Sequence, residues 1–262
     1  MRVAVLGSGS AGNATCIEAG GARLLLDAGF SCRELAARLR AVGVEPHRLD
    51  GLLVTHEHAD HVRGAALFSK TYRVPLHCTA ATFRAAGLAR AAPNGHGAHA
   101  HLTVEPGAPF AVGGMTVAAF PVPHDAVETV GYTVSCAGKN FGYATDLGHD
   151  PEPVRRALSD CDLLMLESNH DLDMLREGPY PLVVKQRVLG RHGHLDNETA
   201  AALLCDVATD RTVRVILAHL SRTNNRPELA LGAARREFER RGRRAPDLHP
   251  AGQSGPSPWF EV

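Results

Sequence analysis

The sequence predicts an α/β protein folded as a four-layer αβ/βα sandwich, and three observations lead to this fold class. Strand and helix patterns alternate in the first part of the chain, whereas residues 102 to 145 have the pattern of strands alone. A second alternation of helix and strand follows. Two strand-rich halves, each covered by helices, bury their apolar faces best when the sheets pack against each other. We expect residues 1–262 to form a single domain.

The first half begins with apolar segments that are typical of strands. They cover residues 2–6, 15–19 and 22–26, and Gly20-Gly21 suits the hairpin turn between the last two. Ser31 and Glu34 then have the spacing of a capping box, which predicts a helix that ends at Gly43. The other elements expected in this half are a buried strand at 52–55, a helix at 61–72, a strand at 74–79, a short helix at 81–89 and a loop at 92–101.

The second half is expected to start with a run of strands joined by turns at Gly113-Gly114 and Gly138-Lys139. These strands are 101–106, 115–124, 128–138 and 139–146. A helix at 151–160 has proline in its first turn, which is a favoured position for proline. The expected elements that follow are a strand at 161–168, a helix at 196–208, a strand at 212–220, a helix at 227–242 and a loose tail at 252–258.

Composition excludes several classes of protein. The chain has 28 basic and 28 acidic residues, so no overall field draws it to nucleic acid or to an anionic membrane, and any phosphate site must be local. Six single cysteines without a CxxC pair indicate buried thiols rather than disulfides or a thiolate zinc site. The N-terminus lacks the pattern of a signal peptide and no segment has transmembrane length, so we expect a cytoplasmic protein without membrane contact.

A glycine pattern at the start resembles a dinucleotide-binding loop. Gly7, Gly9 and Gly12 follow a strand, and Asp27 lies at about the distance of a ribose-binding acid. That fingerprint needs a helix at the third glycine, whereas residues 13–28 have the pattern of a β-hairpin. We therefore expect no nucleotide cofactor.

The stretch LLVTHEHADHVRG, residues 52–64, concentrates ligand side chains behind a buried strand. His56 and His58, two residues apart in an extended loop, turn to the same side, whereas Asp60 and His61 at the start of the next helix point elsewhere. A single histidine is usually structural, but four ligand-type residues in one string indicate metal. Imidazole and carboxylate suit zinc or manganese, and this arrangement serves two ions.

Two ions need further ligands, and these are expected at the ends of other apolar strands. His124, Asp146 and His219 each follow such a strand, which places them on one rim of the sandwich. Asp146 has two oxygens and is the natural bridge. Two divalent ions about 3.5 to 4 Å apart share a water and lower its pKa to about 7, and the hydroxide is then the nucleophile.

These residues carry a family resemblance. THEHADH, with Asp27 before it and His124, Asp146 and His219 after it, resembles the metallo-β-lactamase superfamily over essentially the whole chain. The resemblance implies an αβ/βα sandwich. It also implies that Asp27 orients ligands, and we include Asp27 and Asp60 among the catalytic residues. The implied ligands are His56, His58 and His124 for one ion, Asp60, His61 and His219 for the other, and Asp146 for both.

Flanking motifs resemble the YycJ/WalJ-like branch, whose members are related to ribonuclease Z and cyclic phosphodiesterases and are described as DNA exonucleases. The chain departs from the pattern at Asp196, where serine is expected. Candidate substrate-binding residues in these motifs are Asn13, Ser221 and Asn224. The motifs are 7–13, 167–175, 178–181, 193–197 and 218–225.

His194 precedes a helix expected to be capped by Asp196 or Asn197, so it would lie beside free N–H groups that favour a phosphate. Phosphodiester cleavage expels a poor leaving group, which a histidine can protonate. We therefore assign His194 as general acid or phosphate ligand, as the related phosphodiesterases imply. The alternative is a loop histidine like its neighbour His192.

The predicted function is a binuclear phosphodiesterase that acts as a 5′-to-3′ exonuclease on single-stranded DNA. One alternative is a thioester or small-ester hydrolase of glyoxalase II type, and another is a non-catalytic, metal-stabilised binding protein. The segments between Asp146 and His219 all resemble core elements, which leaves no room for a large lid. Substrate contacts are then expected from loops and from a homodimer partner. The arginine run at 234–244 is interpreted as a solvated helix face rather than a nucleic-acid track.

Overall fold

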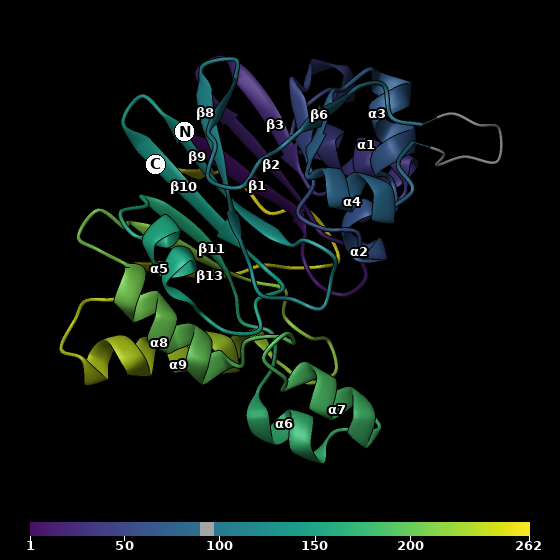
Figure 1. Ribbon diagram of the computed structural model, residues 1–262. Coiled ribbons are helices and arrows are strands. Elements are labelled where there is room, and N and C mark those ends of the chain that lie inside the picture. The colour runs from purple at the N-terminus through teal and green to yellow at the C-terminus, as the bar shows by residue number, and fades with distance from the viewer. Residues whose placement is uncertain (90–96) are drawn as a thin grey trace.

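The computed structural model describes residues 1–89 and 97–262 and shows two seven-stranded sheets packed face to face (Figure 1). Helices cover the outer face of each sheet, so the layers run helix, sheet, sheet, helix. The expected four-layer αβ/βα sandwich is confirmed.

The first sheet has the strand order β14-β1-β2-β3-β4-β5-β6. The Gly20-Gly21 turn between β2 and β3 has φ of 57° and 76°, which glycine adopts without steric cost. The strands are β1 (Arg2–Gly7), β2 (Ala14–Ala19), β3 (Ala22–Leu26), β4 (Gly51–Leu53), β5 (Leu76–Cys78), β6 (His101–Thr103) and β14 (Phe260–Glu261). The helices on this side are α1 (Cys32–Ala41), the short 3₁₀ helix η1 (Pro46–Arg48), α2 (Ala59–Val62), α3 (Ala65–Tyr72) and α4 (Ala80–Ala85).

The second sheet has the order β13-β12-β11-β10-β9-β8-β7. Its outer face is covered by α5 (Glu152–Leu158), α8 (Asn197–Val207) and α9 (Pro227–Arg240), as Figure 1 shows. The strands are β7 (Phe110–Val112), β8 (Met115–Pro121), β9 (Val130–Cys136), β10 (Lys139–Ala144), β11 (Leu163–Glu167), β12 (Arg214–Ala218) and β13 (Asp247–Pro250).

A central core fills the space between the sheets. It includes Leu24 and Ile17 from the first sheet and Tyr132, Phe141 and Met165 from the second, each at most 1% exposed. Burying one such side chain contributes about 1.5 to 3 kcal/mol. Two further cores lie under the outer helices, so both faces of each sheet are covered.

Strand direction places the functional segments on one edge, which we call the rim. Strands β3 to β6 are parallel to one another, as are β10 to β13. The rim consists of the segments that follow the carboxyl ends of β3, β4, β8, β10, β11 and β12. In open α/β sheets this is where ligands bind.

Several expectations need correction. The helix at 61–72 is interrupted at Gly64, where a Cβ would lie 2.3 Å from the Phe30 carbonyl oxygen. The tail at 252–258 is tied to β1 by Ser257, and β13 before it and β14 after it form where no strand was expected. The loop at 92–101 lies partly outside the described residues, and His101 already belongs to β6.

The largest difference is a pair of short helices between Asp146 and His219. These are α6 (Leu172–Glu177) and α7 (Leu182–Val188), which project from the sandwich (Figure 1). None of the residues of α7 is buried. The expectation that this part of the chain holds only core elements is therefore wrong, because the aliphatic run at 182–184 is exposed. We call α6 and α7 the helical hairpin.

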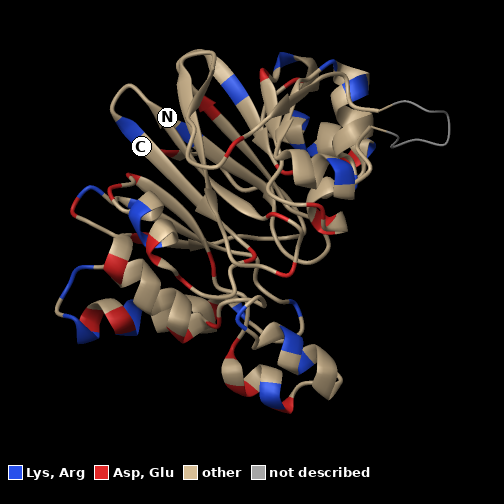
Figure 2. Cartoon of the chain, viewed as in Figure 1, with Lys and Arg blue, Asp and Glu red and all other residues tan. Residues whose placement is uncertain are grey.

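Charged residues on the outer helices lie in mixed groups. Figure 2 shows both signs interspersed along α9, where Arg236 pairs with Glu198, Arg240 with Glu237 and Arg241 with both Glu237 and Asp206. This matches the solvated helix face expected for the arginine run. Among the described helices, none combines the length and the apolar character that crossing a bilayer requires.

Candidate metal centre

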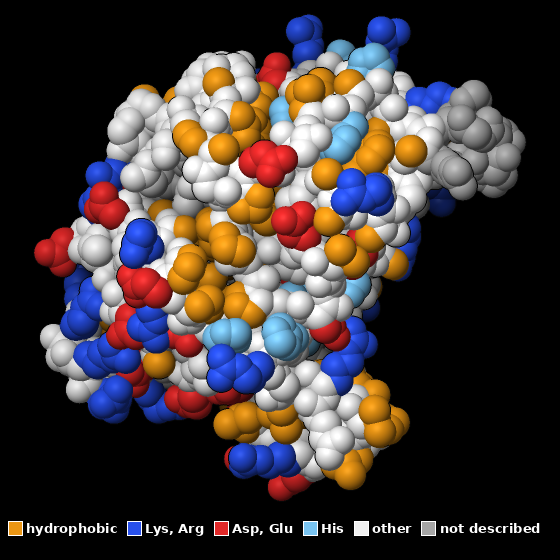
Figure 3. Space-filling model, viewed as in Figure 1, with side chains coloured by type: hydrophobic (Ala, Val, Ile, Leu, Met, Phe, Trp, Pro, Cys, Tyr) orange, Lys and Arg blue, Asp and Glu red, His pale blue; other side chains and the backbone are white. Residues whose placement is uncertain are grey.

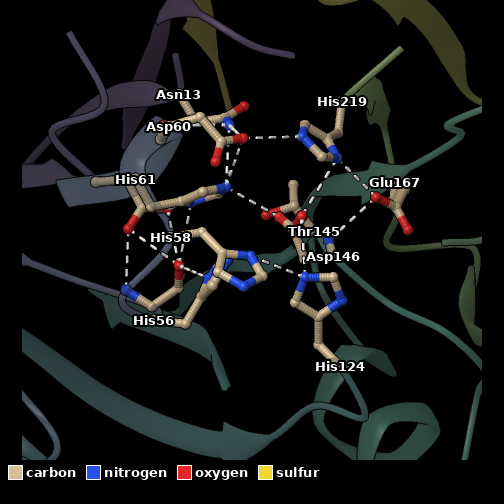
Figure 4. A network of polar contacts seen from close by, with 12 residues as sticks. Asn13, His56, His58, Asp60, His61, His124, Thr145, Asp146, Glu167 and His219 are labelled. Carbon is tan, nitrogen blue, oxygen red and sulfur yellow. Dashed lines mark hydrogen bonds and ion pairs between the residues drawn. The ribbon is translucent and has the colours of Figure 1, made fainter. Parts of the chain in front are cut away.

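The rim brings the expected ligand residues together from four segments of the chain (Figure 4). The stretch after β4 supplies His56 and His58 from an extended loop and Asp60 and His61 from α2. His124 follows β8, Asp146 follows β10 and His219 follows β12. Four groups of ligand atoms result, and within each group the atoms lie within 4.8 Å of one another.

His56, His58 and His124 form the first group. His58 Nδ1 lies 3.3 Å from His124 Nε2. His56 is fully buried, and burial together with its histidine neighbours lowers its pKa well below the usual value. A neutral imidazole with a free ring nitrogen is the form that binds a metal.

Asp60, His61 and His219 form the second group. Asp60 Oδ2 lies 3.6 Å from His61 Nε2 and 3.5 Å from His219 Nε2. Asp146 lies between the groups: its Oδ1 is 3.6 Å from His124 Nε2 and its Oδ2 is 3.1 Å from His61 Nε2. Asp146 Oδ1 also lies 3.5 Å from His219 Nδ1, so the Asp146 carboxylate contacts members of both groups.

Three of the histidines are each held at one ring nitrogen by a group behind the ring. His61 Nδ1 lies 2.8 Å from Asp27 Oδ2, and His219 Nδ1 lies 2.8 Å from Glu167 Oε1. His124 Nδ1 lies 3.2 Å from the Gly193 carbonyl oxygen. Such contacts fix the ring and leave the other nitrogen for a metal.

Backbone conformation at the rim is strained. Asp27, Asp146 and His219 have φ of 61°, 57° and 55°, in the left-handed region that residues other than glycine rarely adopt. Each comes directly after or close to the end of a strand. Strain of this kind is kept where the surrounding structure imposes it, and it is concentrated at functional sites.

The donor set fits divalent cations. His56 Nε2, Asp146 Oδ2 and His219 Nε2 are buried and have no hydrogen-bond partner within the described part of the chain. A buried polar atom without a partner costs about 1 to 3 kcal/mol, which a bound cation offsets. None of the ion pairs of Asp60 and Asp146 recorded over residues 1–89 and 97–262 involves lysine or arginine, so the ion-pair partners of these carboxylates there are histidines.

Comparison with known proteins agrees with this geometry. A sequence profile of the β-lactamase superfamily domain matches residues 22–219. The chain is 33% identical to the exodeoxyribonuclease WalJ of Streptococcus pneumoniae, over 88% of this chain and 85% of the relative. It is also 33% identical to the exodeoxyribonuclease YycJ of Bacillus anthracis, over 92% and 90% of the two chains. The chain belongs to the metallo-β-lactamase superfamily.

Solved structures of this superfamily share the fold. The metallo-β-lactamase fold protein YhfI from Bacillus subtilis superposes with a TM-score of 0.73, at 17% identity and 99% coverage of both chains. The short form of human tRNase Z gives a TM-score of 0.65 at 17% identity, covering 98% of each chain. The resemblance to the superfamily and to its YycJ/WalJ-like branch is confirmed, and membership supports a metal-dependent hydrolase of a nuclease branch.

Glu167 is a site residue that the sequence analysis did not single out. Its Oε1 accepts from His219 and from His194 Nδ1, 3.0 Å away, and its Oε2 accepts from the backbone of Leu195 and Leu147. Although burial opposes it, His194 and His219 hold the pKa of Glu167 at about 2. The signal was present, because Glu167 ends an apolar strand just as Asp146 follows one.

His194 lies at the rim beside both groups. Its ring stands 5.2 Å from those of His124 and His219, and its Nδ1 is 3.8 Å from Asp146 Oδ1. Burial lowers the pKa of His194, but the adjacent Glu167 outweighs it and the pKa is raised. The side chain is 20% exposed, so its ring remains accessible from the rim.

The N–H groups at the start of α8, beside His194, were expected to be free, but in this described segment they have acceptors. Asp196 caps α8 and its Oδ1 accepts from Glu198 and Thr199, while the Asn197 N–H donates to the His170 carbonyl. The start of α8 is thus already satisfied, and that part of the His194 prediction is wrong.

The three candidate substrate-binding residues occupy different surroundings. Asn13 is buried, with its Nδ2 3.0 Å from His61 Nε2 and 3.3 Å from Asp60 Oδ2. Ser221 and Asn224 form a buried turn in which the Asn224 N–H donates to Ser221 Oγ. Asn13 therefore lies against the second group, whereas Ser221 and Asn224 contact each other; substrate binding by all three stays a prediction.

The glycine loop at the N-terminus leads into the β2–β3 hairpin, as expected, instead of a helix. Its residues serve the metal centre: Asn13 Oδ1 accepts from the Gly9 N–H and Ser8 Oγ, and Ser8 Oγ accepts from the His219 N–H. The loop thus links Asn13 to the His219 backbone.

Proposed function

We propose that this protein is a binuclear metal-dependent phosphodiesterase that acts as an exonuclease on DNA. The observation that carries the proposal is the placement of Asp146 between two groups of ligand residues, where two buried ring nitrogens and one carboxylate oxygen make no hydrogen bond within the described residues. The names of the relatives WalJ and YycJ supply the substrate class.

The two metal ions would be zinc or manganese. His56, His58 and His124 would hold one ion, Asp60, His61 and His219 the other, and Asp146 would contact both. When bound, such ions lower the pKa of a water that they share and neutralise charge on a phosphate. Asp27 and Glu167 would keep His61 and His219 in the orientation that binding needs.

His194 would supply the proton that the leaving oxygen requires. Its Nδ1 is engaged by Glu167, so Nε2 is the nitrogen available to the rim. Glu167 stabilises the protonated ring, as a carboxylate does in other acid–base pairs. The geometry therefore favours general-acid catalysis by His194 over the role of a passive loop residue.

Single-stranded DNA and 5′-to-3′ polarity are the finer parts of the proposal. They are tested with metal-loaded protein and oligonucleotides labelled at either end, offered single-stranded and as duplex. Shortening of the single strand from its 5′ end is expected. Cleavage of duplex alone, or from the 3′ end, would contradict these finer parts, but the protein would still be a nuclease.

The reaction class is tested with bis-p-nitrophenyl phosphate and a glutathione thioester. A phosphodiesterase releases p-nitrophenol, and chelation stops the reaction. Turnover of the thioester alone would replace the proposal by a glyoxalase II-like hydrolase. Bound metal without hydrolysis of either ester would replace it by a metal-stabilised binding protein.

We further propose that two copies of the chain associate through α7. Leu182, Val183 and Leu189 are 69%, 76% and 49% exposed. Lys185 donates to the Arg176 carbonyl, so the face at 182–184 offers aliphatic groups and suits a protein better than a polyanion. The balanced net charge does not oppose self-association. Sedimentation should show a dimer that Val183→Glu dissociates; a monomeric parent protein would exclude it.

Cytoplasmic location stays a prediction, which cell fractionation checks.

A further inference from the structure

We propose that Arg187 forms a phosphate subsite beside the metal centre, which binds the phosphate next to the one being cleaved. The inference rests on the proposed function insofar as the substrate is a nucleic-acid strand. It assigns to the helical hairpin a role in substrate binding that neither the ligand residues nor the family motifs provide.

The last turn of α7 lies against the rim. The Val188 carbonyl accepts from the His194 N–H at 3.0 Å, and the Gly193 carbonyl contacts His124 Nδ1. A Cβ on Gly193 would stand 2.1 Å from the Val188 oxygen, so this close approach requires glycine. The position of Arg187 is therefore fixed relative to both His124 and His194.

Asp125 links Arg187 to the first ligand group. Arg187 Nε donates to Asp125 Oδ2, while Asp125 Oδ1 lies 3.2 Å from His124 Nε2 and 3.9 Å from His58 Nε2. One carboxylate thus separates the guanidinium from two histidines of the centre. A strand whose scissile phosphate sits at the centre carries its neighbouring phosphate close to Arg187.

The guanidinium has donors to spare. Over residues 1–89 and 97–262, its recorded partner is Asp125 through Nε, and no acceptor is recorded for Nη1 or Nη2. The side chain is 65% exposed. A guanidinium held at one donor and open at the others is oriented for the two-pronged contact that arginine makes with phosphate.

The surroundings favour an anion. Arg191 follows α7 and contacts His149, which lies in the loop after Asp146. Figure 3 shows histidine and basic side chains next to one another on the face just above the helical hairpin. Arg155, by contrast, is more fully neutralised, because it pairs with both Asp150 and Asp206.

The test measures binding of a fluorescent 5′-labelled oligothymidylate by anisotropy at several salt concentrations. Metal-loaded protein with His194→Ala is used, so that DNA cleavage is slow during the measurement. Arg187→Ala in this background is expected to weaken binding about tenfold, since a charge-assisted contact is lost. The slope of log affinity against log salt should shrink by about 0.7, as expected for one phosphate of a single strand. Arg187→Lys should retain the slope.

Arg240 provides the matched control. It is 69% exposed, pairs with one acid and lies at the end of α9 away from the rim. Arg240→Ala should bind as the parent does. If Arg187→Ala also matched the parent in affinity and slope, the subsite would be overturned. If the otherwise unmodified protein cleaves no phosphodiester but its DNA binding depends on Arg187, the subsite is supported and the proposed nuclease activity is excluded.

Discussion

The two ends of the second sheet use acidic residues in opposite ways. At the rim, Asp146 and Glu167 are buried and face histidines. At the other end, Asp162 precedes β11 and pairs with Arg211 at 2.7 Å and Lys139 at 3.0 Å. It also accepts from the Asn140 N–H. The same kind of side chain is thus neutralised by permanent cations at one end and by titratable rings at the other.

This difference distinguishes the rim, which suits ligand binding, from the opposite end of the sheet, which contributes to stability. An arginine partner satisfies the carboxylate and leaves no acceptor for a ligand, whereas buried rim atoms such as Asp146 Oδ2 and His219 Nε2 make no hydrogen bond within the described residues. The rim therefore holds polar groups that a metal satisfies, and the opposite end holds groups that satisfy one another. Substitutions at the two ends should affect different measurements.

Asp146→Ala should have the largest effect. It removes the group that faces both ligand sets, so bound metal should fall from two ions to one or none and phosphodiester hydrolysis by about 10³-fold or more. Elemental analysis of purified protein and assay of bis-p-nitrophenyl phosphate measure both. Two retained ions would contradict the bridging role.

His194→Ala should slow DNA cleavage by about 10²-fold, because the leaving oxygen then lacks its proton donor. Loss on bis-p-nitrophenyl phosphate should be smaller, since p-nitrophenolate leaves without protonation. His192→Ala, two residues away and exposed, is the matched control and should change neither rate. Equal losses on both substrates would argue against an acid role.

Glu167→Gln should reproduce part of the His194 effect and weaken metal binding about 10- to 100-fold, as loss of a group behind a ligand does. The reason is that Glu167 holds both His194 and His219. Competition with a calibrated chelator gives the affinity. Unchanged affinity would show that the backbone alone orients His219.

Metal bound at the rim should raise the free energy of unfolding. At a free concentration 100 times its dissociation constant, one ion adds about 2.7 kcal/mol to the free energy of unfolding. Thermal melts with and without chelator measure this shift. Asp146→Ala should reduce it, whereas a charge removed at the opposite end should leave it unchanged; equal shifts in both would break the comparison.

Asp162→Asn should have the smallest effect, lowering the free energy of unfolding at neutral pH by about 1 kcal/mol after allowance for solvent screening, with activity retained. Burial alone would raise its pKa, but Arg211, the Asn140 N–H and Lys139 lower it to about 2. A carboxyl whose pKa is lower in the folded than in the unfolded protein stabilises the fold at pH values above its unfolded-state pKa. This contribution is lost as the pH falls through about 2. Denaturant titrations across acid pH should show the variant and parent converge there.

Periodicity and turn residues predicted most of the sandwich. Ser31 caps α1 as expected, although the Glu34 carboxylate pairs with Arg38 instead of returning to the cap. The helical hairpin was missed because the run at 182–184 looks like core and is exposed, and no local pattern reports exposure. Strand β14 was missed because a two-residue strand has no periodicity; its pairing with β1 is a long-range contact.

At the site, strand ends were the informative signal. His124, Asp146 and His219 were found because each follows an apolar strand, and Glu167 satisfies the same rule. The part that sequence could not supply is which ring nitrogen faces inward, since that depends on Asp27, Glu167 and Gly193 from distant segments. Arg187 carried no motif, and only the fold brings it to Asp125.

The helical hairpin leaves and rejoins the sandwich at one point. The Asn169 N–H donates to the Leu195 carbonyl at 2.9 Å, and His170 and Asp196 form a β-bridge. The two ends of the intervening segment therefore lie side by side, and we expect that its length can change without rebuilding the strands beneath. Its closing turn, with Val188 and Arg187, is the constrained part, because there the segment contacts His194 and Asp125 beside the metal centre.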